Sequence, residues 1–208
     1  MLGQPLPIII TIALTLVPAL VLHELAHAIV AVQLGDETPR RMGRLTLNPL
    51  VHLDPIGTLA FLLAGFGWAK PVMVNPYNLR PGPHMGMGIV AAAGPFTNFL
   101  LAVIAALPVR FGLVPDIGGG SILPSLPTFL TIFALLNLSL VFLNLIPVPP
   151  LDGSKILRAV APREWDRFLN PLEQYGPLLL MALFFLGRGF LGAIITQPAQ
   201  AVLRFLLG

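Results

Sequence analysis

The sequence contains no cysteine, and only 10% of its 208 residues are charged. The absence of cysteine excludes disulfide bonds and thiol chemistry, so a transition-metal site in this chain has to use histidine and carboxylate ligands. Soluble domains contain roughly 25% charged residues. Because the mean hydropathy is also high, at +0.86, the shortage of charge indicates an integral membrane protein.

The chain also lacks an internal repeat, a low-complexity tract and a linker long enough to separate two domains. We therefore expect a single membrane-embedded domain over residues 1–208. The amino terminus has no basic segment and no small-residue cleavage site, so it does not resemble a removable signal peptide. The net charge of +3 comes from basic residues in short loops between apolar segments, which predicts membrane orientation and not nucleic-acid binding.

Apolar segments and prolines together predict the fold class. Long helices are expected at about 8–34, 87–107, 128–145 and 175–190. The tail from Pro198 is too short to span a membrane by itself. After the first helix, Pro and Gly clusters exclude continuous helix, and pieces such as GRLTLN and KPVMVN look like short strands. We expect an all-α polytopic membrane protein with about four to six transmembrane helices and a re-entrant or β-hairpin segment after the first helix.

The apolar segment from Pro55 to Ala69 is ambiguous by length alone, but the distribution of positive charge indicates how it lies. If it enters the membrane and returns, nine basic residues face one side and three face the other, which is the bias expected of cytoplasmic loops. If it spans, each side receives six. The nine are Arg40, Arg41, Arg44, Lys70, Arg80, Lys155, Arg158, Arg163 and Arg167, and the three are Arg110, Arg188 and Arg204. We therefore expect a re-entrant segment or part of a sheet packed at membrane depth, whose backbone is satisfied by protein or a water-filled cavity.

The first apolar helix carries the motif HELAH, residues 23–27, near its middle. A lone charge at the centre of a membrane helix costs about 2.5 to 3.5 kcal/mol on insertion scales, so these residues require a reason. Residues four apart share one helix face, so His23 and His27 can reach one metal ion while Glu24 lies beside it. The H-E-x-x-H pattern indicates a zinc site whose glutamate takes a proton from zinc-bound water. The alternative is a buried polar network that fixes helix packing.

A catalytic zinc ion normally has three protein ligands. The continuation H-x-x-G-x-x-H fails here, because Val30 and Gln33 stand where glycine and histidine are required. Asp152 is the outstanding candidate, since it follows a charge-free window from 117 to 151 in the sequence NLIPVPPLDGSKI. The alternative role for this aspartate is that of a helix N-cap or turn residue. With a re-entrant segment after the first helix, His27 and Asp152 approach the same membrane face, and with a spanning segment they approach opposite faces.

Three motifs, HELAH, AAGPFTNFLLA and NLIPVPPLDG, resemble the site-2 protease family of intramembrane zinc metalloproteases, peptidase family M50. The similarity runs from about Leu22 to Leu157. It implies a minimal form without PDZ or CBS domains, with a catalytic core at about 8–160 and an additional C-terminal helix at about 174–195. The resemblance implies one zinc ion per chain with ligands His23, His27 and Asp152, Glu24 as general base and acid, and Asn98 and Asn144 as contacts to the substrate strand or the developing oxyanion. Helix packing is the alternative role for the two asparagines.

The predicted function is intramembrane zinc endopeptidase: cleavage of transmembrane segments of client membrane proteins by glutamate-assisted attack of zinc-bound water, as in regulated intramembrane proteolysis. The expected partners are a transmembrane protein substrate and the lipid bilayer, with no nucleic acid. A prokaryotic plasma membrane, with the site toward the cytoplasm, is the expected location. The competing hypothesis is a metal-binding membrane protein without peptidase activity, either a zinc transporter or an inactive client-binding relative. For His52 and Asp54 we expect structural roles, and for His84 an interfacial loop position.

Overall fold

The computed structural model describes residues 6–64, 67–117, 119–120 and 123–208. Over these residues the chain is helical and forms no strand ladder. The helices are α1 (Leu6–Gln33), α2 (Thr38–Arg41), α3 (Pro49–His52), α4 (Pro55–Ala64), η1 (Pro76–Asn78), α5 (Pro83–Arg110), α6 (Leu126–Asn144), α7 (Asp152–Val160), η2 (Arg163–Trp165), α8 (Asp166–Leu186), α9 (Arg188–Leu191), η3 (Gly192–Thr196) and α10 (Gln197–Leu207).

Four helical segments of the described chain are long and apolar enough to cross a membrane: Leu6–Gln33, Pro83–Arg110, Leu126–Asn144 and Gly189–Leu207. The expected class, an all-α polytopic membrane protein, is confirmed. The first three segments agree with the sequence-based bounds to about one helical turn. The α5 helix begins earlier than expected because Pro83 occupies its first turn, where the missing proline N–H removes no hydrogen bond.

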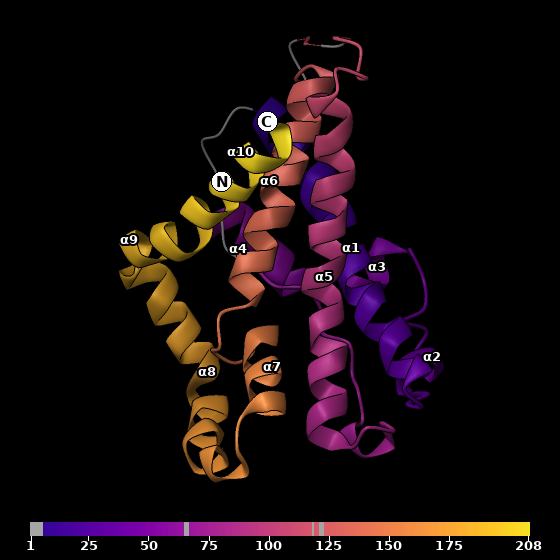
Figure 1. The fold of residues 1–208 in the computed structure, drawn as a ribbon, viewed down its shortest axis with the longest axis vertical. Coiled ribbons are helices and arrows are strands. Elements are labelled where there is room, and N and C mark those ends of the chain that lie inside the picture. Colours follow the sequence, from indigo (N-terminus) through magenta and orange to yellow (C-terminus); the bar gives the residue numbers. More distant parts are fainter. Residues whose placement is uncertain (1–5, 65–66, 118, 121–122) are drawn as a thin grey trace.

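The long α5 helix forms the axis of the molecule, with α1 and α6 packed beside it and α7 below the end of α6 (Figure 1). Small side chains line the contact between α5, α6 and α10, including Ala102, Ala106, Ala134 and Ala199. Small residues let helix backbones approach closely inside a membrane. Since α1 and α6 both run antiparallel to α5, their carboxyl ends lie at the same end of the bundle.

The segment after α1 turns back on itself, in agreement with the re-entrant path that the positive-charge bias predicted. Leu53 and Ala69 form an isolated antiparallel bridge, and the backbone N–H of Lys70 donates to the carbonyl of His52 over 2.7 Å. The chain therefore leaves and returns at one place, and α4 is not among the helices long and apolar enough to cross a membrane. A helix of ten residues reaches about 15 Å, which is half the thickness of the hydrocarbon core.

The expected β-hairpin is wrong, because GRLTLN and KPVMVN pair with no other strand in the described chain. Both pieces end at an Asn-Pro pair. Asn48 and Asn75 accept hydrogen bonds from the backbone two residues later and cap the short helices α3 and η1. Proline removes a backbone donor and asparagine favours local capping, so both features compete with a strand ladder.

The C-terminal region differs from the single helix expected at about 174–195. Helix α8 already begins at Asp166 and ends at Leu186, and a second helical run follows through α9, η3 and α10. The tail from Pro198 is part of the candidate span Gly189–Leu207. Sequence reasoning treated Gly187 as lying inside one helix, whereas the structure ends α8 there.

A buried carboxylate fastens the end of α1 to the loop before α5. Asp36 has no exposed surface. Its Oδ2 accepts from the backbone N–H of Asn75 at 2.7 Å, and its Oδ1 accepts from the Asn78 amide at 2.9 Å and from both donors of Thr38. Burial alone would raise the pKa of Asp36, but these hydrogen bonds stabilise the carboxylate and hold its pKa below the ordinary value.

Replacing Asp36 with asparagine is expected to destabilise the fold by about 1.5 to 3 kcal/mol, the range for hydrogen bonds to a charged group. Because the folded pKa lies below the unfolded value of 3.8, the contribution of the carboxylate is complete above that pH and is lost as pH falls through the folded pKa. Thermal unfolding in detergent at pH 7 and at pH 3 measures both effects. A variant as stable as the wild type at pH 7 would contradict the prediction.

Candidate metal centre

Two imidazoles and one carboxylate converge between α1 and the start of α7. The Nε2 atoms of His23 and His27 lie 3.0 Å apart, and Asp152 Oδ2 lies 3.1 Å from the first and 3.3 Å from the second. The three ligand atoms fall within 4.8 Å of one another, and all three residues are buried. The structure thus brings together the residues that H-E-x-x-H and the L-D-G motif predicted as ligands, and we call them the His-His-Asp group.

Asp152 reaches the histidines because α7 begins directly against the end of α6. A side chain on Gly153 would lie 2.3 Å from the carbonyl oxygen of Leu145 and 2.5 Å from that of Ile146. Only glycine therefore allows this close approach, which explains the glycine after the aspartate. The other carboxylate oxygen of Asp152, Oδ1, lies 3.6 Å from Lys155 Nζ, so the carboxylate faces the imidazoles on one side and an ammonium group on the other.

Helix α5 orients both imidazoles from behind. His23 Nδ1 lies 2.5 Å from Asn98 Oδ1, and His27 Nδ1 lies 2.7 Å from the carbonyl oxygen of Val90. Both partners are acceptors, so both Nδ1 atoms carry the proton and both Nε2 lone pairs point into the His-His-Asp group. Three lone-pair-bearing atoms thus converge, and a cation between them removes their mutual repulsion. This donor set of two imidazole nitrogens and one carboxylate oxygen fits zinc.

Asn98 lies behind the ligands and not in the cavity in front of them. Its side chain has no exposed surface, and its Nδ2 donates to Asn137 Oδ1 at 2.8 Å. In this position Asn98 holds the ring of His23, and contact with substrate, as the resemblance implied, has no support in the geometry. Asn137 and Val90 were missed by sequence reasoning, because a backbone carbonyl and a lone amide in an apolar helix give no pattern.

Gly94 of α5 faces both imidazoles directly. A side chain there would lie 2.4 Å from Cε1 of His23 and 2.6 Å from Cε1 of His27. Both rings are held from behind by Asn98 and Val90, so neither can retreat without losing its hydrogen bond. The small residue is required because helix α5 crosses α1 at the site.

We expect Gly94→Ala to lower zinc affinity by at least the 10- to 100-fold that losing one outer hydrogen bond of a ligand typically causes. The measurement is zinc content of detergent-purified protein at limiting zinc. Gly189→Ala is the matched control, since nothing lies within 4 Å of a side chain at that position. Equal zinc content in the two variants would mean that the imidazoles tolerate displacement.

Glu24 and the His-His-Asp group share a cavity of about 300 Å³, which we call the Glu24 cavity. Among the described residues, the Glu24 carboxylate makes no hydrogen bond and no ion pair, so it is free to accept a proton. Asn144 also lines this cavity; its Nδ2 donates to the carbonyl of Leu140 at 3.0 Å. The structure thus separates the two predicted asparagines, with Asn144 at the cavity and Asn98 behind the His-His-Asp group.

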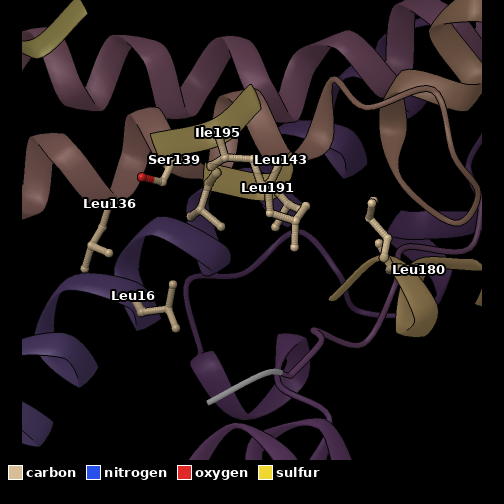
Figure 2. A pocket seen from close by; sticks show the side chains of 9 residues that line it. Leu16, Leu136, Ser139, Leu143, Leu180, Leu191 and Ile195 are labelled. Atoms are coloured by element: carbon tan, nitrogen blue, oxygen red, sulfur yellow. The ribbon is translucent and has the colours of Figure 1, made fainter. Parts of the chain in front are cut away.

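Two apolar pockets adjoin the Glu24 cavity. One, of about 150 Å³, is lined by leucine and isoleucine side chains from α1, α6, α8 and the C-terminal helices, and by Ser139 of α6 (Figure 2). The other, of about 270 Å³, lies between α1, α4 and α6. Leu140 and Leu143 line both pockets and the Glu24 cavity. The polar site is therefore bordered by apolar space beside α6.

Other histidines and acids singled out in the sequence lie apart from the site. His52 Nε2 donates to the carbonyl of Thr46 at 2.8 Å, and Asp54 Oδ1 accepts from the backbone N–H of Gly57 at the start of α4. Both therefore have local structural partners. His84 lies in the exposed first turn of α5.

Comparison with known proteins points in the same direction as the geometry. Residues 119–186, which include Asp152, match the family model described as Peptidase family M50. The chain is 36% identical over 206 residues to a Bacillus subtilis protein named "Putative zinc metalloprotease YwhC", covering 96% of this chain and 92% of that protein.

More distant relatives match the chain over part of their own length. Identity is 31% over 170 residues with "Putative zinc metalloprotease Rip2" of Mycolicibacterium smegmatis, covering 79% of this chain and 62% of that protein. It is 28% over 147 residues with "Zinc metalloprotease MJ0392" of Methanocaldococcus jannaschii, covering 71% and 33%. No solved structure matches the chain.

Proposed function

The chain belongs to peptidase family M50, and we propose that it is an intramembrane zinc endopeptidase that cleaves transmembrane segments of client proteins. The observation that carries this proposal is the Glu24 cavity, where an unpaired carboxylate and three convergent ligand atoms lie within a bundle of apolar helices. A soluble substrate would not require its catalytic groups at membrane depth.

His23, His27 and Asp152 would hold the zinc ion, one per chain. When bound in such a site, zinc lowers the pKa of a coordinated water to about 7 and polarises a carbonyl group. The protein's own residues then have defined tasks: Asn98 and Val90 fix the imidazoles, and Glu24 accepts a proton from water and passes it to the leaving amine. The amide of Asn144 is the polar group at the cavity best placed to contact the substrate backbone.

A client segment must leave the helical state to be cut, because a regular helix keeps its carbonyls in internal hydrogen bonds. Residues 70–75 offer a place for the extended form. Val72 and Val74 line the Glu24 cavity while Met73 between them is 56% exposed, an alternation typical of extended backbone. In the described part of the chain, the backbone groups of these three residues form no hydrogen bond. We propose that a client strand pairs with this edge, in the manner of β-augmentation.

The apolar pockets indicate how a client reaches the cavity, and the basic residues indicate how the protein is oriented in the membrane. The apolar pockets beside α6 can receive the client's side chains as it arrives from the lipid. The re-entrant segment is consistent with the excess of basic residues at the end of the bundle that bears the metal ligands. We therefore place that end toward the cytoplasm of a prokaryotic cell, with the protein in the plasma membrane.

The test uses synthetic single-span peptides of about 20 apolar residues in liposomes with the purified protein. An Asn-Gly pair, which weakens a helix, is moved stepwise along the span. A matched series carries Ala-Leu at the same positions. We expect metal-dependent cleavage inside the span for at least one Asn-Gly register and for none of the Ala-Leu peptides. A zinc-loaded protein that cleaves no member, or cuts only outside the span, would favour a metal-binding protein without peptidase activity.

A further inference from the structure

Segment 70–75, which forms one wall of the Glu24 cavity, is held at both ends by buried charged side chains. Arg44 contacts its start and is 2% exposed, and Asp36 contacts its end and is fully buried. Neither residue lines the Glu24 cavity, and neither belongs to a motif of the sequence. Both nevertheless contact the wall that faces the metal ligands.

Arg44 fixes the start of the segment through backbone carbonyls. Its Nη1 donates to Lys70 O at 3.1 Å and to Val51 O at 2.8 Å, and its Nη2 donates to Pro71 O at 3.1 Å. No carboxylate pairs with this guanidinium among the described residues. The planar guanidinium presents its donors in a fixed fork, so it sets the position of the carbonyls that it joins. Val51, which belongs to α3, is thereby tied to the start of the segment.

Asp36 fixes the other end and connects it to the helix that bears the metal ligands. It lies shortly after α1, which ends at Gln33, and its Oδ2 accepts from the backbone N–H of Asn75 at 2.7 Å. Beside it, the backbone N–H of Arg80 donates to Leu34 O at 2.9 Å. Because α1 also carries His23 and His27, these contacts tie the end of segment 70–75 to the ligand-bearing helix.

Between the residues that Arg44 and Asp36 hold, the backbone of the segment is free to pair with a client strand. The backbone groups of Val72, Met73 and Val74 make no hydrogen bond in the described chain, whereas the residues on either side are held. An edge that is fixed at its ends and open in its middle suits the binding of a strand in one register. A slip of one residue would move the strand by about 3.3 Å and turn every side chain to the opposite face.

We propose that Arg44 and Asp36 are positioning residues, which set the register of the client strand against the metal ligands and so determine which peptide bond is cut. This inference rests on the proposed peptidase function. A positioning role differs from a role in stability alone. Removing the hydrogen bonds of either Arg44 or Asp36 should change where the client is cut and how well it binds, while the metal site stays intact.

The first test compares Arg44→Met with Arg41→Met, which makes the same substitution at an exposed position of α2. The substrate is the best-cleaved Asn-Gly peptide, and mass spectrometry identifies the products. We expect Arg44→Met to raise KM at least tenfold, to change kcat less than threefold, and to spread cleavage over neighbouring bonds, with zinc content unchanged. Arg41→Met should match the wild type. Cleavage at the single wild-type bond with wild-type KM would overturn the proposal.

Asp36→Asn supplies an independent second variant, assayed at a temperature where it remains folded. It removes a negative charge where Arg44→Met removes a positive one, and it acts at the opposite end of the segment. The same spread of cleavage sites from both variants is expected, since both free the same wall. If Asp36→Asn keeps the wild-type cleavage bond despite reduced stability, its role is structural only and the proposal fails.

A cross-link keeps the test decisive if Arg44→Met is unstable. Leu53 and Ala69 form the antiparallel bridge at the base of the segment, and the flanking bond from Lys70 to His52 makes them a non-hydrogen-bonded pair, whose spacing of about 4.5 Å suits a disulfide. In a chain without cysteine, Leu53→Cys with Ala69→Cys gives one defined bond. In the Arg44→Met background, oxidation should restore the single cleavage bond and reduction should remove it. A zinc-loaded, oxidised protein with scattered cleavage would overturn the proposal, whereas a wild type that cleaves no peptide would refute the peptidase function itself.

Discussion

Replacing Glu24 with glutamine should leave zinc bound and lower the cleavage rate by about 10²- to 10⁴-fold, the contribution of a positioned general acid-base group. Glutamine keeps the size of the side chain but cannot accept a proton from water. The carboxylate lines the Glu24 cavity and makes no hydrogen bond or ion pair with described residues, so its replacement breaks neither kind of interaction in the described chain.

Single-turnover cleavage of the Asn-Gly peptide and zinc content of the same preparation measure the Glu24→Gln effect. Glu164→Gln, at an exposed position outside the cavity, is the control for the charge change. Retained activity would remove Glu24 from the proton-transfer role. Loss of zinc together with activity would instead mean that the carboxylate maintains the site, which is unexpected because Glu24 forms no hydrogen bond or ion pair with His23 or His27.

The convergence of His23, His27 and Asp152 was predictable because regular geometry connects these positions to the sequence. Helical spacing alone places His23 and His27 on one face, and counting crossings brings Asp152 to the same end of the bundle. The positive-charge bias predicted a re-entrant segment at 55–69, and the bridge between Leu53 and Ala69, which brings the two ends of this segment together, agrees with that prediction. These inferences use periodicity, crossing number and charge balance, which are properties of the sequence itself.

The roles of some residues could not be predicted, because they depend on contacts with residues that are distant in the sequence. Such contacts leave no periodic pattern in the sequence. Asn98 was expected at the substrate and lies instead behind His23, because the rotation of α5 about its axis decides which way the amide points. The contacts of Arg44 and Asp36 could not be predicted for a similar reason. Their partners are largely backbone atoms, which every residue possesses, so no residue pattern indicates them. KPVMVN was expected to pair as a strand, yet it remains an open edge because the adjoining residues are held by side chains instead.

Asp152→Ala is expected to abolish stoichiometric zinc binding, although both histidines of the HELAH motif remain. With one of three ligands gone, affinity should fall by more than the 10- to 100-fold caused by losing an outer-shell partner. Asp152 also pairs with Lys155 at 3.6 Å, so the aspartate could matter through that ion pair alone.

Lys155→Met separates these two roles of Asp152, because it breaks the ion pair and leaves all three ligands, and should therefore retain zinc. Asp116→Ala, in an exposed loop, controls for loss of an acid. Zinc at 100 times its dissociation constant adds about 2.7 kcal/mol to folding stability, so added zinc should raise the Tm of the wild type and of Lys155→Met but not that of Asp152→Ala. If zinc stabilises Asp152→Ala as much as the wild type, the carboxylate is not a ligand, and the two histidines bind metal without the motif that ends α6.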